Sequence, residues 1–424
     1  MTTVDPPTAA SDPPNGGRVL DDDAAALLAE WLALTPVPVH EQPLAQSRNS
    51  GLVNAEITGP SPVVPSVEDR DVGGVRVRIY RPDVGAAPPV LVYAHGGGWT
   101  LLSIDSSDVI CRHLAAGAGC AVVSVDYRLA PEHPFPAAFD DVWAVATWVD
   151  GGGLGWVPPS LAIGGDSAGG NIAAGVSTHA RDHGGLRVDF QLLLYPALDT
   201  SLDTPSMLEL GPDLRFRLMP ETMRWFWRNY LGESGTSDDP RAVPMAARSK
   251  AGLPSTLVVT AGWDPLRDDG ARYAEALAAA GTPVEVYEAS ALPHGFAMML
   301  GRSGAARRAF ADVVARVAAA LGPATDPPAA PPTELAAEFK ARPFGRHSEE
   351  LQSLLHEMRS QPMSGKHFLF MAEAQRLWVL GRYSDGPPYE PILDWDTTFT
   401  DLEAAEWHVF RIRWQEKFGV ELAL

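Results

Sequence analysis

Short apolar segments alternate with amphipathic segments over most of the chain, and this alternation predicts the elements. A typical amphipathic segment is Gly270–Ala280, which has a helical pattern. Gly281 follows it and is expected to end the helix as a C-cap. The apolar segments that we predict to be strands are Val75–Tyr80, Val90–Ala94, Ala121–Asp126, Leu161–Gly164, Asp189–Leu194, Ser255–Ala261 and Val284–Glu288. Strands that alternate with helices indicate a mostly parallel sheet covered on both faces. The sequence therefore predicts an α/β domain.

The pattern changes before this region and again within it. Residues 1–18 are rich in proline and have little to bury, which predicts a disordered N-terminus. After Asp21, apolar residues at helical spacing predict an N-terminal helix, and they are Leu27, Leu28, Trp31 and Leu32. Residues 205–245 interrupt the alternation with a helical stretch that contains Met223, Trp225, Phe226, Trp227 and Tyr230. We expect this aromatic insertion to cap a pocket.

The C-terminal part of the chain differs in composition from the rest. We assign residues 19–321 to one large domain and residues 322–333, which are rich in proline, to a semi-stiff linker. Residues 334–424 are rich in aromatic side chains and predict a small, mainly helical accessory domain. The apolar residues that keep helical spacing there are Leu351, Leu354, Leu355 and Met358, and then Trp407, Phe410 and Trp414.

Charge and composition exclude several classes of function. The formal net charge of −20 repels phosphate backbones and anionic lipids, so we expect neither nucleic acid nor a membrane as partner. No apolar run has the length that a membrane-spanning helix needs. The N-terminus lacks the basic start and apolar core of a signal peptide, so we expect a cytoplasmic protein. Cys111 and Cys120 are too few for a disulfide framework and form no metal-binding pair.

The motif Gly165-Asp166-Ser167-Ala168-Gly169 directly follows the predicted strand Leu161–Gly164 and precedes a segment that can begin a helix. A strand, Gly-x-Ser-x-Gly and a helix in this order form a nucleophile elbow. The turn is so tight that side chains two residues before and after the serine would clash, which explains both glycines. We predict that Ser167 is a catalytic nucleophile.

A second glycine-rich turn, His95-Gly96-Gly97-Gly98-Trp99, follows the predicted strand Val90–Ala94. Attack on an ester carbonyl creates an oxyanion, which needs preorganised N–H donors. Consecutive glycines let backbone amides approach that oxygen with no side chain between them. The predicted donors of this oxyanion hole are the N–H groups of Gly96, Gly97, Gly98 and Ala168.

A nucleophilic serine needs a base, and the base needs an orienting carboxylate. In this type of fold the chain order is serine, acid, histidine. Asp264 follows the predicted strand Ser255–Ala261, and His294 follows the next one, so both lie where parallel sheets build their sites. Asp268 and Asp269 compete with Asp264 for the role of the acid, but they lie further into the following helix. We predict a triad of Ser167, Asp264 and His294.

These motifs together resemble the hormone-sensitive lipase family of esterases, also called bacterial family IV. The residues that carry the resemblance are His95–Trp99, Asp126–Glu132, Gly165–Gly170, Asp264–Leu266 and His294–Phe296. The resemblance covers residues 20–321. It implies an α/β-hydrolase fold with an N-terminal helical cap and a serine carboxylesterase that hydrolyses small to medium acyl esters. It also implies that His95 holds its loop rather than reacting. The mechanism needs no cofactor and no metal.

Residues 334–424 lie outside that family pattern. The segments Arg342–Gly345, Gln361–Met363 and Glu403–Arg413 are weakly similar to the small subunit of N,N-dimethylformamidase. This resemblance implies an accessory or oligomerisation role, so a homo-oligomer formed through these residues is a further hypothesis. It also keeps open an amidase that uses the same triad. His347, Glu349, His356 and Glu357 do not form a metal-binding motif, and we interpret them as surface residues.

Two other questions stay open at this point. A non-catalytic receptor for a small ligand can share the scaffold, as gibberellin receptors do, but such receptors have lost a member of the triad, and this sequence keeps all three. The aromatic residues that we expect to shape the substrate pocket are Trp99, Trp225 and Phe226. The substrate is a small-molecule ester or amide whose chain length the sequence leaves undetermined.

Overall fold

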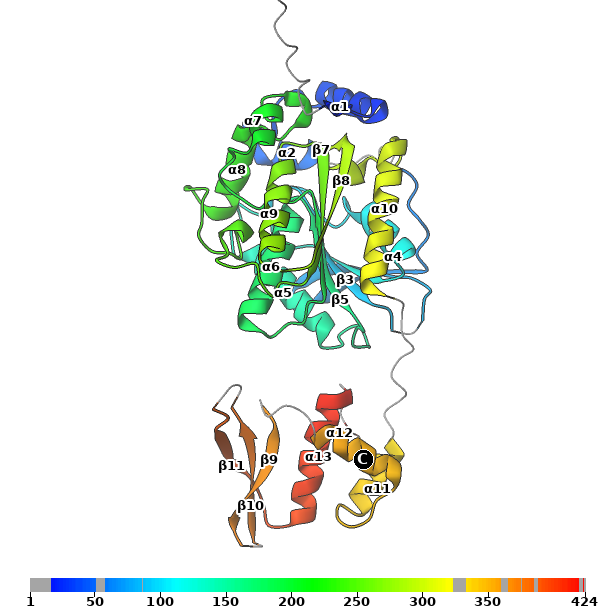
Figure 1. Ribbon diagram of the computed structural model, residues 1–424, viewed down its shortest axis with the longest axis vertical. Coiled ribbons are helices and arrows are strands. Elements are labelled where there is room, and N and C mark those ends of the chain that lie inside the picture. Colours follow the sequence, from blue (N-terminus) through cyan, green and yellow to red (C-terminus); the bar gives the residue numbers. More distant parts are fainter. Residues whose placement is uncertain are drawn as a thin grey trace, which may run out of the picture. The chain divides into compact units, whose positions relative to one another are not determined.

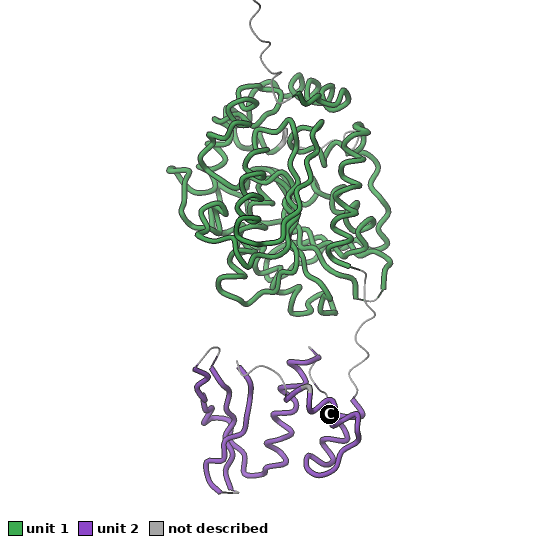
Figure 2. Tube along the Cα trace, viewed as in Figure 1, with its two compact units in different colours: residues 1–325 green, residues 326–424 purple. Residues whose placement is uncertain are grey.

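The computed structural model describes residues 17–50, 58–85, 87–322, 333–359, 365–374, 376–384, 388–418 and 422. The chain divides into two compact units, residues 1–325 and residues 326–424 (Figures 1 and 2). Most of the predicted disordered N-terminus and of the predicted linker lies outside the described residues. None of the described helices combines the length and the apolar character needed to cross a membrane.

The centre of the first unit is a mostly parallel sheet. Among the described residues it has eight strands in the order β1-β2-β4-β3-β5-β6-β7-β8. The neighbouring strands β1 and β2 pair antiparallel, and so do β2 and β4. All further neighbours in this order, from β4 through β3 to β8, pair parallel. The strands are β1 (Ser66–Val72), β2 (Val75–Arg81), β3 (Val90–Ala94), β4 (Ala121–Val125), β5 (Leu161–Asp166), β6 (Phe190–Leu194), β7 (Ser255–Trp263) and β8 (Val284–Pro293). The predicted fold class is confirmed.

Helices cover both faces of this sheet, because its central strands are apolar on both sides. Helices α4 and α10 lie on one face, and α5, α6 and α9 lie on the other (Figure 1). Side chains of β3 alternate between the two cores: Val92 packs toward α5 and α6, while Tyr93 packs toward α4 and α10. The bounds of these helices are α4 (Asp108–Ala118), α5 (Ala137–Asp150), α6 (Ala168–His183), α9 (Arg267–Ala279) and α10 (Gly304–Leu321).

A cap of short elements covers the end of the sheet toward which β7 and β8 point (Figure 1). Its N-terminal part begins at Asp21, whose carboxylate caps the first turn by accepting from Ala24 N–H. Its second part is the aromatic insertion between β6 and β7. The elements of the cap are α1 (Asp22–Leu34), η2 (Val39–Glu41), α2 (Leu44–Ser50), α7 (Pro205–Leu210), η3 (Leu214–Phe216) and α8 (Pro220–Leu231). Short 3-10 turns η4 (Pro244–Ala246) and η5 (Phe296–Met298) complete the unit.

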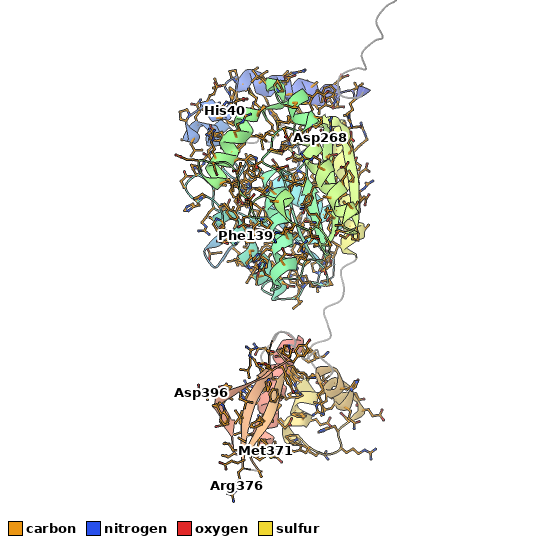
Figure 3. All side chains as sticks on the ribbon, turned by 60° about the vertical axis from the view of Figure 1, so that its left-hand side comes forward. His40, Phe139, Asp268, Met371, Arg376 and Asp396 are labelled. Carbon is orange, nitrogen blue, oxygen red and sulfur yellow. The ribbon has the colours of Figure 1, made fainter. Side chains whose placement is uncertain are left out.

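The second unit has a core of its own. Its helices are α11 (Thr333–Ala341), α12 (Glu349–Arg359) and α13 (Leu402–Phe418), and Phe339 stacks on Phe410 with ring centroids 4.4 Å apart. The strands β9 (His367–Glu373), β10 (Leu377–Tyr383) and β11 (Pro391–Phe399) form an antiparallel sheet beside α13. This sheet exposes large side chains, among them Met371, labelled in Figure 3. The helices and the aromatic cluster agree with the sequence analysis, which did not anticipate the sheet.

Candidate active site

Ser167 occupies the turn between β5 and α6. Its φ of 55° is rare for a residue with a side chain and marks a strained turn at a functional position. A Cβ atom on Gly165 or on Gly169 would clash with the carbonyl oxygen of Ala94, so only glycine fits at either place. Helix α6 begins at Ala168, directly after the serine, so the partial positive charge of the helix N-terminus lies next to Ser167.

The residues Ser167, His294 and Asp264 form one hydrogen-bonded chain. Nε2 of His294 lies 3.0 Å from Oγ of Ser167, and Nδ1 of His294 lies 2.8 Å from Oδ2 of Asp264. The carboxylate accepts from Nδ1–H, which leaves Nε2 free to accept the serine proton. Asp264 is fully buried, and its second oxygen accepts from Leu266 N–H at 2.8 Å. This second bond holds the carboxylate in position for the histidine.

The two competing carboxylates have other partners. Asp268, labelled in Figure 3, accepts from Ser206 N–H at 2.8 Å and from the guanidinium of Arg267. Asp269 is buried and accepts from Leu198 N–H at 3.3 Å, and burial raises its pKa to about 7. Of the three carboxylates, it is that of Asp264 that the structure places in hydrogen-bond contact with His294.

The glycine-rich turn after β3 lies beside Ser167. Gly97 has a φ of 106° and Gly98 a φ of 58°, and both line the same cavity as Ser167 and Ala168. The proposed donor Gly96 is different, because its N–H donates to Oδ1 of Asp166 at 2.9 Å and is therefore engaged. Of the four predicted donors, Gly97, Gly98 and Ala168 line the cavity, and Gly96 does not.

His95 is a structural part of this turn. Its Nδ1–H donates to the carbonyl of Gly96 at 2.7 Å, and its ring stacks on Tyr127 at a centroid distance of 4.2 Å. The hydroxyl of Tyr127 donates to the carbonyl of His95 at 2.8 Å. Burial lowers the pKa of His95 to about 4, so the ring is neutral near pH 7. These contacts agree with a role in holding the loop.

Asp166 is a site residue that the sequence analysis did not single out. Its buried carboxylate accepts from the hydroxyl of Tyr93 at 2.8 Å as well as from Gly96 N–H. It thereby ties the elbow after β5 to the turn after β3. Burial raises the pKa of this carboxyl, although both hydrogen bonds act in the opposite direction. In the sequence, Asp166 occupies the first variable position of the Gly-x-Ser-x-Gly motif, and this position is the one signal that could have pointed to it.

The triad opens into a mostly apolar cavity. Trp99 and Phe226, two of the residues that we expect to shape the substrate pocket, line this cavity. Trp225 does not line it, and its ring packs against the ring of Phe226 at a centroid distance of 5.1 Å. The further lining residues, which lay outside the prediction, are Leu102, Ala197, Leu218, Met223, Gly295 and Met298.

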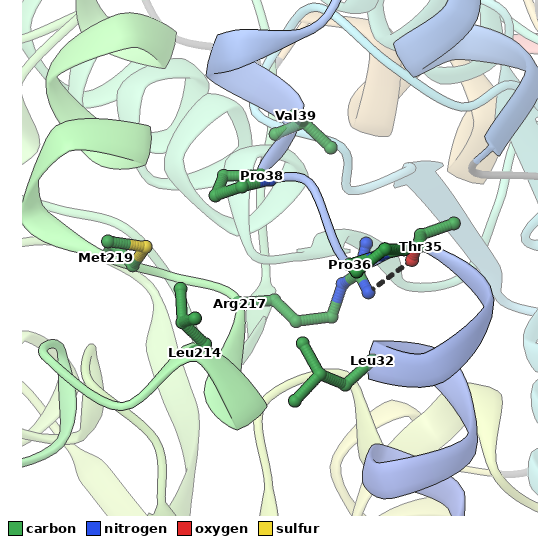
Figure 4. Close-up of a pocket in the computed structure, with 8 residues that line it drawn as sticks. All are labelled: Leu32, Thr35, Pro36, Pro38, Val39, Leu214, Arg217 and Met219. Atoms are coloured by element: carbon green, nitrogen blue, oxygen red, sulfur yellow. Dashed lines mark hydrogen bonds between the residues drawn. The ribbon is translucent and has the colours of Figure 1, made fainter.

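A second, smaller cavity lies inside the cap, and no member of the triad lines it (Figure 4). Arg217 crosses it and donates to Thr35 Oγ1 at 2.6 Å and to the carbonyl of Trp31 at 3.3 Å. Burial lowers the pKa of this guanidinium. Because the carbonyls at the end of α1 carry partial negative charge, Arg217 caps that helix and joins the two parts of the cap.

The sheet, the strained serine at a strand–helix turn and the cavity beside it define a serine hydrolase of the α/β-hydrolase fold. Comparison with known proteins places the chain more closely. Residues 91–298 match the model of the alpha/beta hydrolase fold, and residues 327–422 match that of the N,N-dimethylformamidase alpha subunit. The carboxylic ester hydrolase LipN of Mycobacterium tuberculosis is 37% identical over 313 residues, which are 72% of this chain and 78% of LipN. The chain therefore belongs to the α/β-hydrolase family.

Two further proteins support this membership. Esterase LipI of Mycobacterium tuberculosis is 44% identical over 255 residues, which are 58% of this chain and 78% of LipI. The crystal structure of a thermostable esterase from Pseudomonas putida ECU1011 matches with a TM-score of 0.67 at 30% identity. That match covers 72% of this chain and 98% of the Pseudomonas chain. The predicted resemblance to esterases is confirmed.

Proposed function

We propose that this protein is a serine carboxylesterase that hydrolyses small to medium acyl esters through an acyl-enzyme intermediate. The observation that carries the proposal is the chain of contacts Ser167–His294–Asp264 at the wall of an apolar cavity. The names of the relatives, a carboxylic ester hydrolase and an esterase, support the same class of reaction.

In the first half of the proposed reaction, Oγ of Ser167 attacks the acyl carbon of the ester. His294 takes the serine proton on Nε2, and the carboxylate of Asp264 stabilises the imidazolium that forms. The carbonyl oxygen becomes an oxyanion, which the N–H groups of Gly98 and Ala168 stabilise together with that of Gly97. When the tetrahedral intermediate collapses, the alcohol leaves with the proton from His294, and the acyl group stays on the serine.

In the second half, water replaces the alcohol. His294 removes a proton from the water as its oxygen attacks the acyl carbon, and the same N–H groups stabilise the second oxyanion. The carboxylic acid leaves and Ser167 regains its proton. The residues of this chain supply every proton transfer and every charge that the reaction needs.

The cavity supports a substrate without charge near the acyl carbon. Apart from the triad and Asp166, its lining is apolar or glycine, and Asp166 is engaged by Tyr93 and Gly96. An ionised substrate group would lose its hydration here without gaining a partner. Leu218 and Phe226 line the cavity, and we propose that they restrict the acyl chain to small or medium length.

An amidase that uses the same triad is the second candidate. The match of residues 327–422 to the N,N-dimethylformamidase alpha subunit favours it. A cytoplasmic location and a homo-oligomer formed through residues 334–424 remain proposals from the sequence.

The test is hydrolysis of p-nitrophenyl esters from acetate to dodecanoate, measured beside p-nitroacetanilide. We expect ester turnover with a maximum at short or medium chains, and a loss of at least about 10⁴-fold in kcat for Ser167→Ala. Cleavage of the anilide alone would favour the amidase. Unchanged turnover by Ser167→Ala would contradict the assignment of the nucleophile.

A further inference from the structure

One arginine connects the N-terminal cap to the glycine-rich turn. Arg48 lies on α2 and donates from Nε to the carbonyl of Thr100 at 3.1 Å and from Nη2 to the carbonyl of Ala130 at 3.1 Å. Nη1 and Nη2 also bind the two carboxylate oxygens of Glu132 at 2.8 and 2.6 Å. A single planar guanidinium thus joins the cap to two separate loops of the catalytic unit.

The carbonyl of Thr100 belongs to the turn that carries the candidate oxyanion donors. Within this turn, the carbonyl of Gly97 accepts from Thr100 N–H at 3.1 Å and from Leu101 N–H at 2.8 Å. Ala130 N–H donates to the carbonyl of Trp99 at 2.9 Å, so Ala130 also holds the turn. Arg48 therefore binds the turn directly through Thr100 and a second time through Ala130.

We propose that Arg48 is a positioning residue, through which the seated cap holds the turn Gly97–Leu101 in the orientation that directs its N–H groups at the oxyanion. The proposal rests on the proposed esterase function. Peptide planes in this turn are linked, so a rotation that frees the carbonyl of Thr100 also tilts the N–H groups of Gly97 and Gly98. Oxyanion donors act only when they are preorganised, and a displacement of about 1 Å can cost about 100-fold in rate.

The ion pair alone does not account for this arrangement. The side chains of Arg48 and Glu132 are 30% and 51% exposed, and exposed ion pairs contribute little to stability. The two backbone carbonyls are the contacts that only a fork of N–H donors can bind together with a carboxylate. Glu132 then orients the guanidinium toward them.

The experiment compares Arg48→Gln, Arg48→Lys and Glu132→Gln with the wild-type full chain on its best p-nitrophenyl ester. For Arg48→Gln we expect kcat to fall by about 10- to 100-fold with KM within about threefold, because the oxyanion forms only in the transition state. The rate of labelling of Ser167 by a p-nitrophenyl phosphonate should fall by a similar factor, since the phosphonyl oxygen needs the same donors. Arg48→Lys keeps one donor group, so its kcat and labelling rate should lie between those of the wild type and those of Arg48→Gln.

The controls separate positioning from general stability. Arg302 joins the cap helix α1 through Glu30 at 2.7 Å, away from the turn, so Arg302→Gln should keep the wild-type kcat. Glu132→Gln keeps a hydrogen-bond acceptor for Arg48 and should lose less than Arg48→Gln. Thermal unfolding identifies any variant that does not fold, in which case Arg48→Lys decides by the same criterion.

Two results would overturn the inference. The first is an unchanged kcat and labelling rate in a folded Arg48 variant. The second is an equal loss in Glu132→Gln and Arg48→Gln, which would assign the effect to the ion pair. A wild-type protein that cleaves no ester would instead contradict the proposed function itself, so the two failures are distinguishable.

Discussion

The catalytic cavity has two walls that are built in different ways. One wall consists of backbone: the turn of Gly97 and Gly98 and the first residue of α6, Ala168, at the ends of β3 and β5. The other wall consists of apolar side chains, with Met223 and Phe226 from α8. The backbone wall adjoins Ser167, and we expect the side-chain wall to contact the rest of the substrate.

The difference between the walls shows how each can change. No substitution other than proline removes a backbone N–H, so the first wall depends on the conformation of its turns, and glycine is required where a Cβ would clash. A side chain in the second wall can be exchanged for another of similar character at modest cost. We therefore expect substitutions in the first wall to reduce the rate for every substrate, and substitutions in the second wall to change which substrate is preferred.

The largest effect should come from Gly97→Ala. Gly97 has a φ of 106°, and a Cβ there would clash with the carbonyl oxygen of Leu101, so the turn must shift. We expect kcat to fall by about 100-fold or more for all esters alike. Gly281→Ala is the matched control, because Gly281 has a φ of 76° with open space around it. It should lose stability but keep kcat. Equal kcat for both variants would break the distinction between the walls.

A smaller and more selective effect is expected for Phe226→Ala. Phe226 lines the cavity, while its neighbour Trp225 lies outside the lining. Removing the ring should raise the ratio of kcat/KM for decanoate to that for butyrate by about tenfold, since the cavity gains length. Trp225→Ala should leave this ratio unchanged. A shift in Trp225→Ala and none in Phe226→Ala would contradict the assignment of the lining.

The smallest effect on catalysis is expected for Asp269→Asn, which should instead change how stability depends on pH. Burial raises the pKa of Asp269 to about 7 from 3.8, so between these values the folded protein holds a proton that the unfolded chain releases. Its contribution to the free energy of unfolding is complete below about pH 4 and is lost as the pH rises through about 7. Asp269→Asn removes this dependence.

Urea unfolding of the wild type and of Asp269→Asn between pH 4 and pH 8 tests this expectation. The wild type should lose stability relative to the variant as the pH rises over this interval. A difference that does not change with pH would contradict the raised pKa. The kcat of the variant should stay close to that of the wild type, because His294 binds Asp264, while Asp269 accepts from Leu198 N–H.

Features of this chain that depend on local chain geometry could be predicted from its sequence. The elbow around Ser167 and the positions of Asp264 and His294 after consecutive strands follow from short motifs and from the order of the strands. Parallel strands deliver such residues to one edge of the sheet, and the structure brings these three side chains together. The fold class follows in the same way from the alternation of strands and helices.

Three features depended on contacts that no local pattern records. Gly96 resembles its glycine neighbours in sequence, but a carboxylate from another strand, that of Asp166, engages its N–H. Trp225 and Phe226 are adjacent in one helix, yet successive side chains on a helix point in different directions, so only one of them faces the cavity. The strands of the antiparallel sheet β9–β11 show only weak alternation of buried and exposed positions, so this sheet was not predicted.

The sequence by itself therefore determined the fold class and the candidate nucleophile, base and acid, which the structure brings together, because turn sterics and strand order act over short stretches of chain. The tertiary structure decided which N–H groups remain available to an oxyanion, which aromatic rings line the cavity, and that Arg48 of the cap binds the turn at Thr100. Those features depend on residues far apart in the chain, and only packing determines which of them come within contact distance.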